Sequence, residues 1–216
     1  MNKSEILPEI HKILDPLLFE EGYRYLKSQE KYQKKEQGVR LCLDPNITYW
    51  PNSNYCMVSP RISVHVDAIE DYYALHSGQN VDRHSPTLTL LCDNIEGAQY
   101  WSISSRHELH EVTDEIVITI KTVLLPLLES WSNPKKVAIE GLNNRKSLFF
   151  SELHRLTTLF AYCGVYNDIE MLKSTIESVN LERVSCSRMQ LDPHYLEILR
   201  SMKSDIPLIG DIGIDL

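Results

Sequence analysis

The chain has 216 residues, 43% of them hydrophobic, and a formal net charge of -8 at pH 7. This composition excludes a disordered chain, and no apolar stretch reaches the roughly 20 residues that a membrane-spanning helix needs. The five cysteines are widely spaced and form no C-x-x-C pair, which argues against a disulfide framework and a zinc knuckle. Because the N-terminus lacks the pattern of a secretion signal, we expect a cytoplasmic protein that does not associate with membranes.

The negative charge is concentrated in the middle of the sequence. Residues 61–131 carry 4 basic and 11 acidic side chains, whereas residues 1–60 carry 8 of each and residues 132–216 carry 10 and 11. An acidic surface repels nucleic acid and steers association with a basic protein. The alternative is that these acids only solvate a helix and its loops, since charge asymmetry says nothing about the fold.

An amphipathic helix is predicted over residues 4–21, with Ser4 as its N-cap, Gly22 as its stop and a bend at Pro16. Its apolar positions recur at helical spacing: Ile6, Ile10, Ile13, Leu14, Leu17 and Leu18. Short runs typical of strands follow at 23–27, 31–35 and 39–43, with a turn at Gly38.

Residues 44–55 are rich in Pro and Asn and predict a loop that carries aromatic side chains. An exposed Trp50 on this loop would be a recognition residue; alternatively, it folds back to cover the edge of the sheet. Alternating apolar and polar residues then predict strands over 62–67, 87–90 and 101–104. A short helical or irregular excursion over 68–76 and a polar loop over 78–85 separate the first two of these strands.

A long helix is predicted over residues 106–131, with Ser105 as its N-cap. Its apolar residues recur at three- and four-residue steps: Leu109, Val112, Ile116, Ile120, Val123, Leu127 and Trp131. The β-branched run over 116–123 is also compatible with a strand, because branching at Cβ stiffens side chains in helices. Pro126 lacks a backbone donor, so we expect a kink near Thr122.

The strands predict an antiparallel sheet of four to six strands with one apolar face, which the two amphipathic helices cover. The remaining chain has helical periodicity over 135–143, 148–162 and 169–179, with Gly164 ending the second helix and a last short helix capped by Asp192. The sequence therefore predicts an α+β fold: residues 1–131 form the sheet-containing domain, and residues 132–216 form a helical extension that includes a helix hairpin.

The sequence offers few candidates for a catalytic or metal-binding site. His107 and His110 share a helix face. With a further His or carboxylate, such as His65 on the wet face of its strand, they could bind a metal ion and serve a metal-dependent hydrolase. Alternatively, they are simply the solvated end of a helix. There is no G-x-S-x-G elbow, and the 8 glycines form no phosphate-binding loop. We therefore expect no bound cofactor. The lysines at 31, 34 and 35 could contact phosphate or protect an edge strand.

The order of helix, sheet, Tyr-Trp-Ser strand and Pro-containing apolar helix resembles a family of bacterial proteins of unknown function. The matching positions are Ile13, Pro16, Leu17, Gly22, Tyr23, Trp101, Pro126 and Leu127. Members of such families look like accessory or immunity proteins of toxin loci. The resemblance implies binding of a cognate toxin and no catalysis.

The sequence therefore predicts a protein-binding module whose acidic segment covers a basic partner. The residues expected at the interface are Trp50 and the acids Asp67, Glu70, Asp71, Asp82, Glu108, Glu111, Asp114 and Glu115. Two other readings remain open: the metal-dependent hydrolase, and a structural subunit that forms a homodimer or larger homo-oligomer through its helical half.

Overall fold

The computed structural model describes residues 2–78, 80, 86–143, 152–178, 193–207 and 209. The chain divides into two compact units: unit 1 comprises Met1–Val64 and Thr89–Ser132, and unit 2 comprises His65–Leu88 and Asn133–Leu216. The predicted α+β class, with antiparallel strands and flanking helices, is confirmed. The predicted division between residues 131 and 132 stays a prediction. None of the described helices combines the length and apolarity needed to cross a membrane.

Helix α1 (Lys3–Glu20) confirms the first predicted helix, but its N-cap is Asn2 and not Ser4. The Asn2 side chain accepts a hydrogen bond from the Glu5 backbone N–H (3.1 Å), and the Glu5 carboxylate accepts one from the Asn2 N–H (2.9 Å). This reciprocal pair satisfies two N–H groups that a helix start leaves free, which Ser4 cannot do from inside the first turn. One stripe of the helix is buried, consisting of Ile6, Ile10, Leu14, Leu17 and Leu18.

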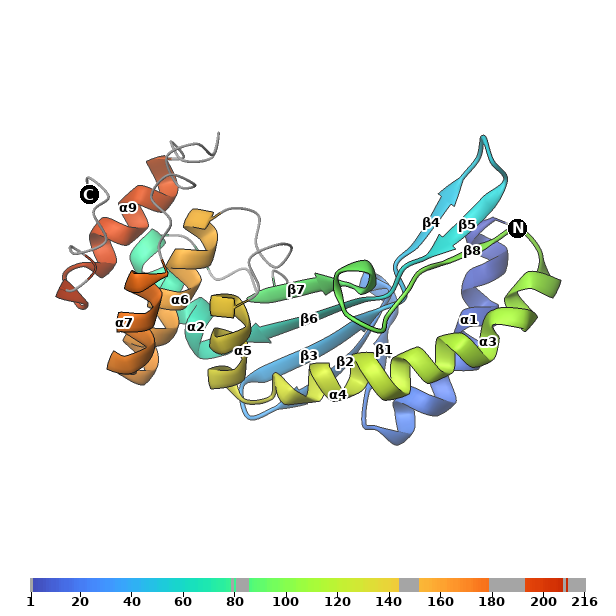
Figure 1. Cartoon of the computed structure of the whole chain (residues 1–216), viewed down its shortest axis with the longest axis horizontal. Coiled ribbons are helices and arrows are strands. Elements are labelled where there is room, and N and C mark those ends of the chain that lie inside the picture. Colours follow the sequence, from blue (N-terminus) through green and yellow to red (C-terminus); the bar gives the residue numbers. More distant parts are fainter. Residues whose placement is uncertain are drawn as a thin grey trace. The chain divides into compact units, whose positions relative to one another are not determined.

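A five-stranded sheet has the order β1-β2-β3-β6-β7 (Figure 1). Its strands are β1 (Arg24–Leu26), β2 (Lys31–Glu36), β3 (Val39–Asp44), β6 (Arg61–Val66) and β7 (Leu88–Leu91). A short 3-10 turn, η1 (Lys27–Gln29), joins β1 to β2. Strands β1, β2 and β3 pair antiparallel, with Tyr25 opposite Tyr32 and Lys34 opposite Leu41. The predicted turn at Gly38 is confirmed, and its φ of 83° suits glycine.

A second sheet of three strands has the order β4-β5-β8, formed by β4 (Ile47–Trp50), β5 (Tyr55–Val58) and β8 (Trp101–Ile103). The predictions of a loop over 44–55 and of a single sheet were therefore wrong. The Pro and Asn residues that suggested a loop lie at the ends of the strands, where Asn46 and Asn54 have positive φ. The four residues between Trp50 and Tyr55 make the hairpin turn.

The long predicted helix is confirmed against the strand alternative, in three consecutive parts. They are α3 (Arg106–Thr119), the π-helical turn η3 (Ile120–Leu124) and α4 (Leu125–Ser130). Ser105 is the N-cap, as predicted, and its hydroxyl accepts the Glu108 N–H at 3.2 Å. Because Pro126 has no N–H to donate, the helix widens in the preceding turn, around Thr122.

The helices of unit 1 cover the two sheets through buried apolar side chains and a few polar contacts. Helices α1 and α3 contact each other and also contact β4 and β8, respectively (Figure 1). Helix α4 contacts β3, and its Glu129 accepts hydrogen bonds from the Tyr23 hydroxyl (2.8 Å) and the Lys34 ammonium (3.0 Å). Burial and this carboxylate together raise the pKa of Tyr23.

Among the described residues of unit 2, helix α6 is central, because α2, α5, α7 and α9 all contact it. The helices are α2 (Asp67–Ser77), α5 (Pro134–Asn143), α6 (Glu152–Tyr166), α7 (Ile169–Glu177) and α9 (Pro193–Met202). The predicted stop at Gly164 was wrong, because α6 continues to Tyr166 and the chain turns at Asn167, where φ is 51°. The predicted cap Asp192 and most of the loop 78–85 lie outside the described residues.

Candidate protein-binding surface

The three-stranded sheet has one covered face and one open face. Alternation along the strands places a set of buried side chains on the side that α1 and α3 cover: Ile47, Cys56, Val58, Trp101 and Ile103. Residues paired across antiparallel strands project to the same side. Trp50 pairs with Tyr55, Thr48 with Met57, and Met57 with Ser102, so these five residues share the opposite side, which we call the open face.

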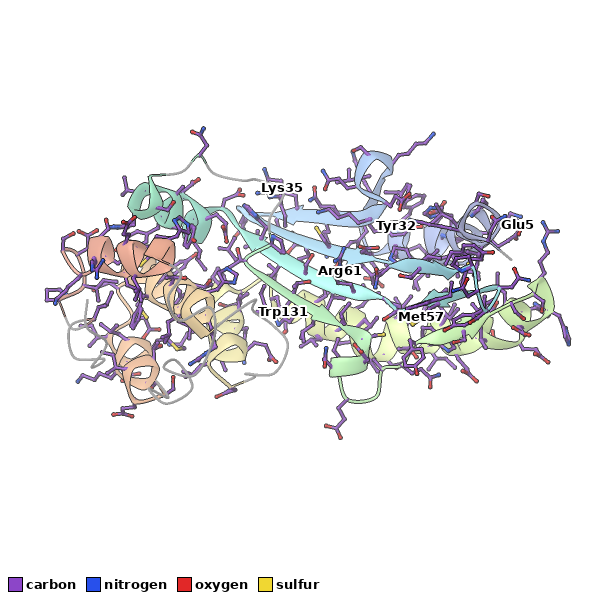
Figure 2. All side chains as sticks on the ribbon, turned by 90° about the horizontal axis from the view of Figure 1, so that it is seen from above. Glu5, Tyr32, Lys35, Met57, Arg61 and Trp131 are labelled. Atoms are coloured by element: carbon purple, nitrogen blue, oxygen red, sulfur yellow. The ribbon has the colours of Figure 1, made fainter. Side chains whose placement is uncertain are left out.

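Trp50 is the largest side chain of the open face and is 47% exposed. It is therefore not folded back against the edge of the sheet, which was the alternative to a recognition role. Tyr55 and Met57 are half-buried beside it, and Met57 is labelled in Figure 2. Strand β4 is the last strand of its sheet within the described part of the chain, so Trp50 lies on an edge.

The composition of this sheet is unusual for an edge that solvent can reach. None of the residues of β4, β5 and β8 is charged, whereas strands β1, β2 and β3 carry seven charged residues: Arg24, Lys31, Lys34, Lys35, Glu36, Arg40 and Asp44. Charged side chains, above all lysine, are the usual protection of a sheet edge against pairing with another chain. The three-stranded sheet lacks that protection on all of its strands.

The predicted acids on α3 have two different environments. Glu108 and Glu115 are used within the fold. Glu108 accepts hydrogen bonds from the Ser104 N–H and hydroxyl (2.7 Å each), and these bonds lower the pKa of its carboxyl. Glu115 accepts hydrogen bonds from Gln99 (3.0 Å) and from the Trp101 indole N–H (3.2 Å). Glu111 and Asp114 are exposed and available to a partner.

Three further predicted acids, Asp67, Glu70 and Asp71, lie on α2, in unit 2. The carboxylate of Asp67 lies 3.3 Å from the His65 imidazole, and Glu70 accepts the Thr87 hydroxyl at 2.6 Å. Asp71 is exposed, and Asp82 lies outside the described residues. The predicted acids of α2 and α3 therefore belong to different units, because the chain leaves unit 1 after Val64 and returns to it at Thr89.

The histidines proposed as metal ligands have separate surroundings. His107 is 81% exposed and contacts Glu111 at 3.4 Å, while His110 is exposed one turn further along α3. The prediction that His65 lies on a wet face was wrong: the residue is only 5% exposed, because both faces of β6 are covered at its C-terminal end. Across the described ranges, no three His, Cys, Asp or Glu side chains come close enough to hold a metal ion.

One polar cluster in unit 2 has no signal in the sequence. The His76 imidazole lies between the Ser201 hydroxyl (2.9 Å from Nδ1) and the Asp205 carboxylate (3.1 Å from Nε2). These residue types resemble a hydrolase triad. However, Ser201 lies in the last turn of α9, where the helix dipole presents negative charge and would oppose a tetrahedral oxyanion. We therefore interpret the cluster as a connection between α2 and α9.

Comparisons of the chain with family models, curated proteins and solved structures found no match. The resemblance to bacterial toxin-locus proteins therefore stays a prediction. The open face and the exposed acids of α3 both belong to unit 1.

Proposed function

We propose that this protein is a non-catalytic module that binds another protein, and that it acts in the cytoplasm as an immunity-type inhibitor of a cognate bacterial toxin. The observation that carries the proposal is the exposure of Trp50 beside Tyr55 and Met57 on an uncharged edge sheet. Tryptophan and tyrosine are enriched among the residues that contribute most to protein–protein binding, because they bury a large rigid surface with a polar tip.

The charge of α3, the helix that covers the other side of this sheet, favours a basic partner. Helix α3 follows β8 after two residues and carries four acidic side chains against one basic side chain, Arg106. Two of these acids, Glu111 and Asp114, are exposed, and the contact of Glu111 with His107 (3.4 Å) lies at the surface. The partner that fits is therefore a basic protein that has an apolar patch for the open face.

The test is to mix the purified protein with the purified products of its neighbouring genes and to measure binding by calorimetry at about 50 mM and about 300 mM salt. We expect a complex that weakens at the higher salt concentration. Trp50→Ala should weaken it about 30-fold, the effect of removing a central aromatic residue worth about 2 kcal/mol. Leu75→Ala is the matched control, because Leu75 is 75% exposed but lies on α2.

Three outcomes would contradict the proposal. The first is the absence of any complex at low salt. The second is a complex that Trp50→Ala and Leu75→Ala weaken equally, since the open face would then contribute nothing particular. The third is a homodimer, detected by light scattering, that Trp50→Ala converts to a monomer. In that case the open face would join two copies of this chain and would not bind a toxin.

A further inference from the structure

A cavity of about 520 Å³ lies in unit 1 between α1, β1 and η1, apart from the open face. Leu7, Pro8 and the ring of Tyr25 form apolar parts of its wall, and His11 and Asp15 provide polar groups. This volume and this mixture of many apolar atoms with a few placed polar groups are typical of small-molecule sites. The polar groups determine which class of ligand the cavity selects.

A chain of short hydrogen bonds determines which nitrogen of His11 carries the proton. The hydroxyl of the fully buried Tyr32 donates to the Asp15 carboxylate at 2.6 Å, and the same oxygen lies 2.6 Å from Nδ1 of His11 (Tyr32 is labelled in Figure 2). Since a hydroxyl has one hydrogen and the carboxylate can only accept, Nδ1 must be the donor to Tyr32. The neutral imidazole then has its lone pair on Nε2.

The His11 ring is also held in place. The Tyr25 ring meets it edge-on with centroids 4.1 Å apart, and the Tyr32 ring lies 5.7 Å away. The His11 side chain is only 18% exposed, and this burial lowers the pKa of His11 below its usual value, although Asp15 and Glu30 act in the opposite direction. Nε2 is therefore an oriented, unprotonated acceptor at neutral pH.

The charged groups around the cavity are of both signs. Lys12 pairs with Glu9 at 2.9 Å, and Glu30 pairs with Lys3 at 2.6 Å. Lys27 and Asp15 add one further charge of each sign to the lining. An anionic ligand would be repelled by Asp15 and Glu30, and a cationic ligand by the lysines. The surroundings therefore favour an uncharged ligand.

We propose that this cavity binds a small uncharged aromatic molecule, of phenol or indole type, which donates one hydrogen bond to Nε2 of His11. The aromatic ring would contact Leu7, Pro8 and Tyr25. This site is independent of the proposed toxin binding, which uses the open face.

Phenol is the probe, and anisole is its control, because anisole has the same ring but no hydrogen to donate. The measurement is the chemical shift of the His11 ring in the full-length protein with labelled histidine, during addition of each compound to about 20 mM. We expect phenol to shift His11 with a dissociation constant of about 1 mM, as for a ligand of few atoms, and anisole to bind at least about 10-fold more weakly. The exposed His107 is an internal control and should not respond.

Two further measurements make the result specific. Acidification of the unaltered protein protonates Nε2, so phenol binding should disappear as the pH falls below the ordinary histidine range. Tyr32→Phe removes the acceptor that fixes Nδ1–H, and this variant should bind phenol several-fold more weakly while keeping its circular dichroism spectrum. The proposal is overturned if His11 does not shift with phenol, if anisole shifts it equally, if His107 shifts to the same extent, or if binding persists in acid.

Discussion

Unit 2 should lose stability in mildly acidic solution because of His154. This residue lies on α6 with its imidazole largely buried, and the burial lowers its pKa from 6.5 to about 4. In the unfolded chain the same imidazole titrates near its ordinary value of about 6.5. Between these two values the unfolded state binds a proton that the folded state does not bind, so the free energy of unfolding must fall as the pH falls.

The size of the loss follows from the difference between the two pKa values. A difference of one pKa unit corresponds to about 1.4 kcal/mol, so a shift from 6.5 to about 4 amounts to about 3 kcal/mol. This contribution to the free energy of unfolding is fully present above pH ~6.5, where His154 is neutral in both states, and it is lost progressively down to pH ~4. A loss of this size is a large fraction of the stability of a typical domain.

The assay must report on unit 2 alone. All three tryptophans, Trp50, Trp101 and Trp131, belong to unit 1, so their fluorescence does not follow α6 directly. Amide hydrogen exchange of α6 peptides, measured by mass spectrometry at several pH values and corrected for the intrinsic exchange rate, gives the local free energy of opening.

The variant His154→Gln removes the titrating group and should flatten the pH dependence of this free energy between pH ~6.5 and ~4 relative to the unaltered protein. Subtracting one curve from the other cancels the contribution of the carboxylates, which also titrate at the lower end of this pH range. His107→Gln is the matched control, because His107 is exposed on α3. Parallel curves for His154→Gln and the unaltered protein would refute the reasoning, since burial of His154 would then have no energetic consequence.

Two substitutions test contacts on which the fold depends. Gly164→Ala would place a Cβ atom 2.5 Å from Cζ of Tyr72, so it should destabilise unit 2 by about 1–3 kcal/mol. In a double-mutant cycle measured by hydrogen exchange, Tyr72→Ala should largely remove this penalty, and a full penalty in the Tyr72→Ala background would contradict the assignment. Glu115→Ala leaves the indole N–H of the buried Trp101 without its acceptor, so it should lower the free energy of unfolding of unit 1 by about 1–3 kcal/mol. Urea unfolding followed by tryptophan fluorescence measures this loss. The control Asp114→Ala, on the exposed side of α3, should lower it less, and equal effects would argue against the Trp101–Glu115 hydrogen bond.

The elements with a long apolar stripe could be predicted from the sequence. In α1 and in the helix that begins at Arg106, several buried residues recur at helical spacing, and that repetition outweighs the prolines at 16 and 126. The β4–β5 hairpin was missed because each strand has four residues and at most two of them are buried. The Pro and Asn of the turn therefore dominate the composition of the segment. The alternation of Ile47 with Thr48, and of Cys56 and Val58 with Met57, was the signal available.

The candidate site was only partly predictable for a related reason. Trp50 could be found from the sequence, since an aromatic residue beside Pro and Asn suggests exposure. Counting the acids could not reveal that Glu108 and Glu115 are bound by Ser104 and Trp101, because a count contains no geometry. The His11–Tyr32–Asp15 chain joins α1 to β2, and no local pattern in a sequence records such a contact.

The distribution of charge in unit 1 suggests that affinity and association rate depend on different residues. The open face contributes apolar area but no charge, and truncation of a buried aromatic residue acts mainly on the dissociation rate. Glu111 and Asp114 are exposed on α3, where solvent and salt screen their charge, and such charges act mainly on the association rate. Under the proposed function, the exposed acids of α3 therefore account for the attraction of a basic partner. Under the proposed function, the residues that hold that partner are those of the uncharged strands, which composition alone does not distinguish from the protein core.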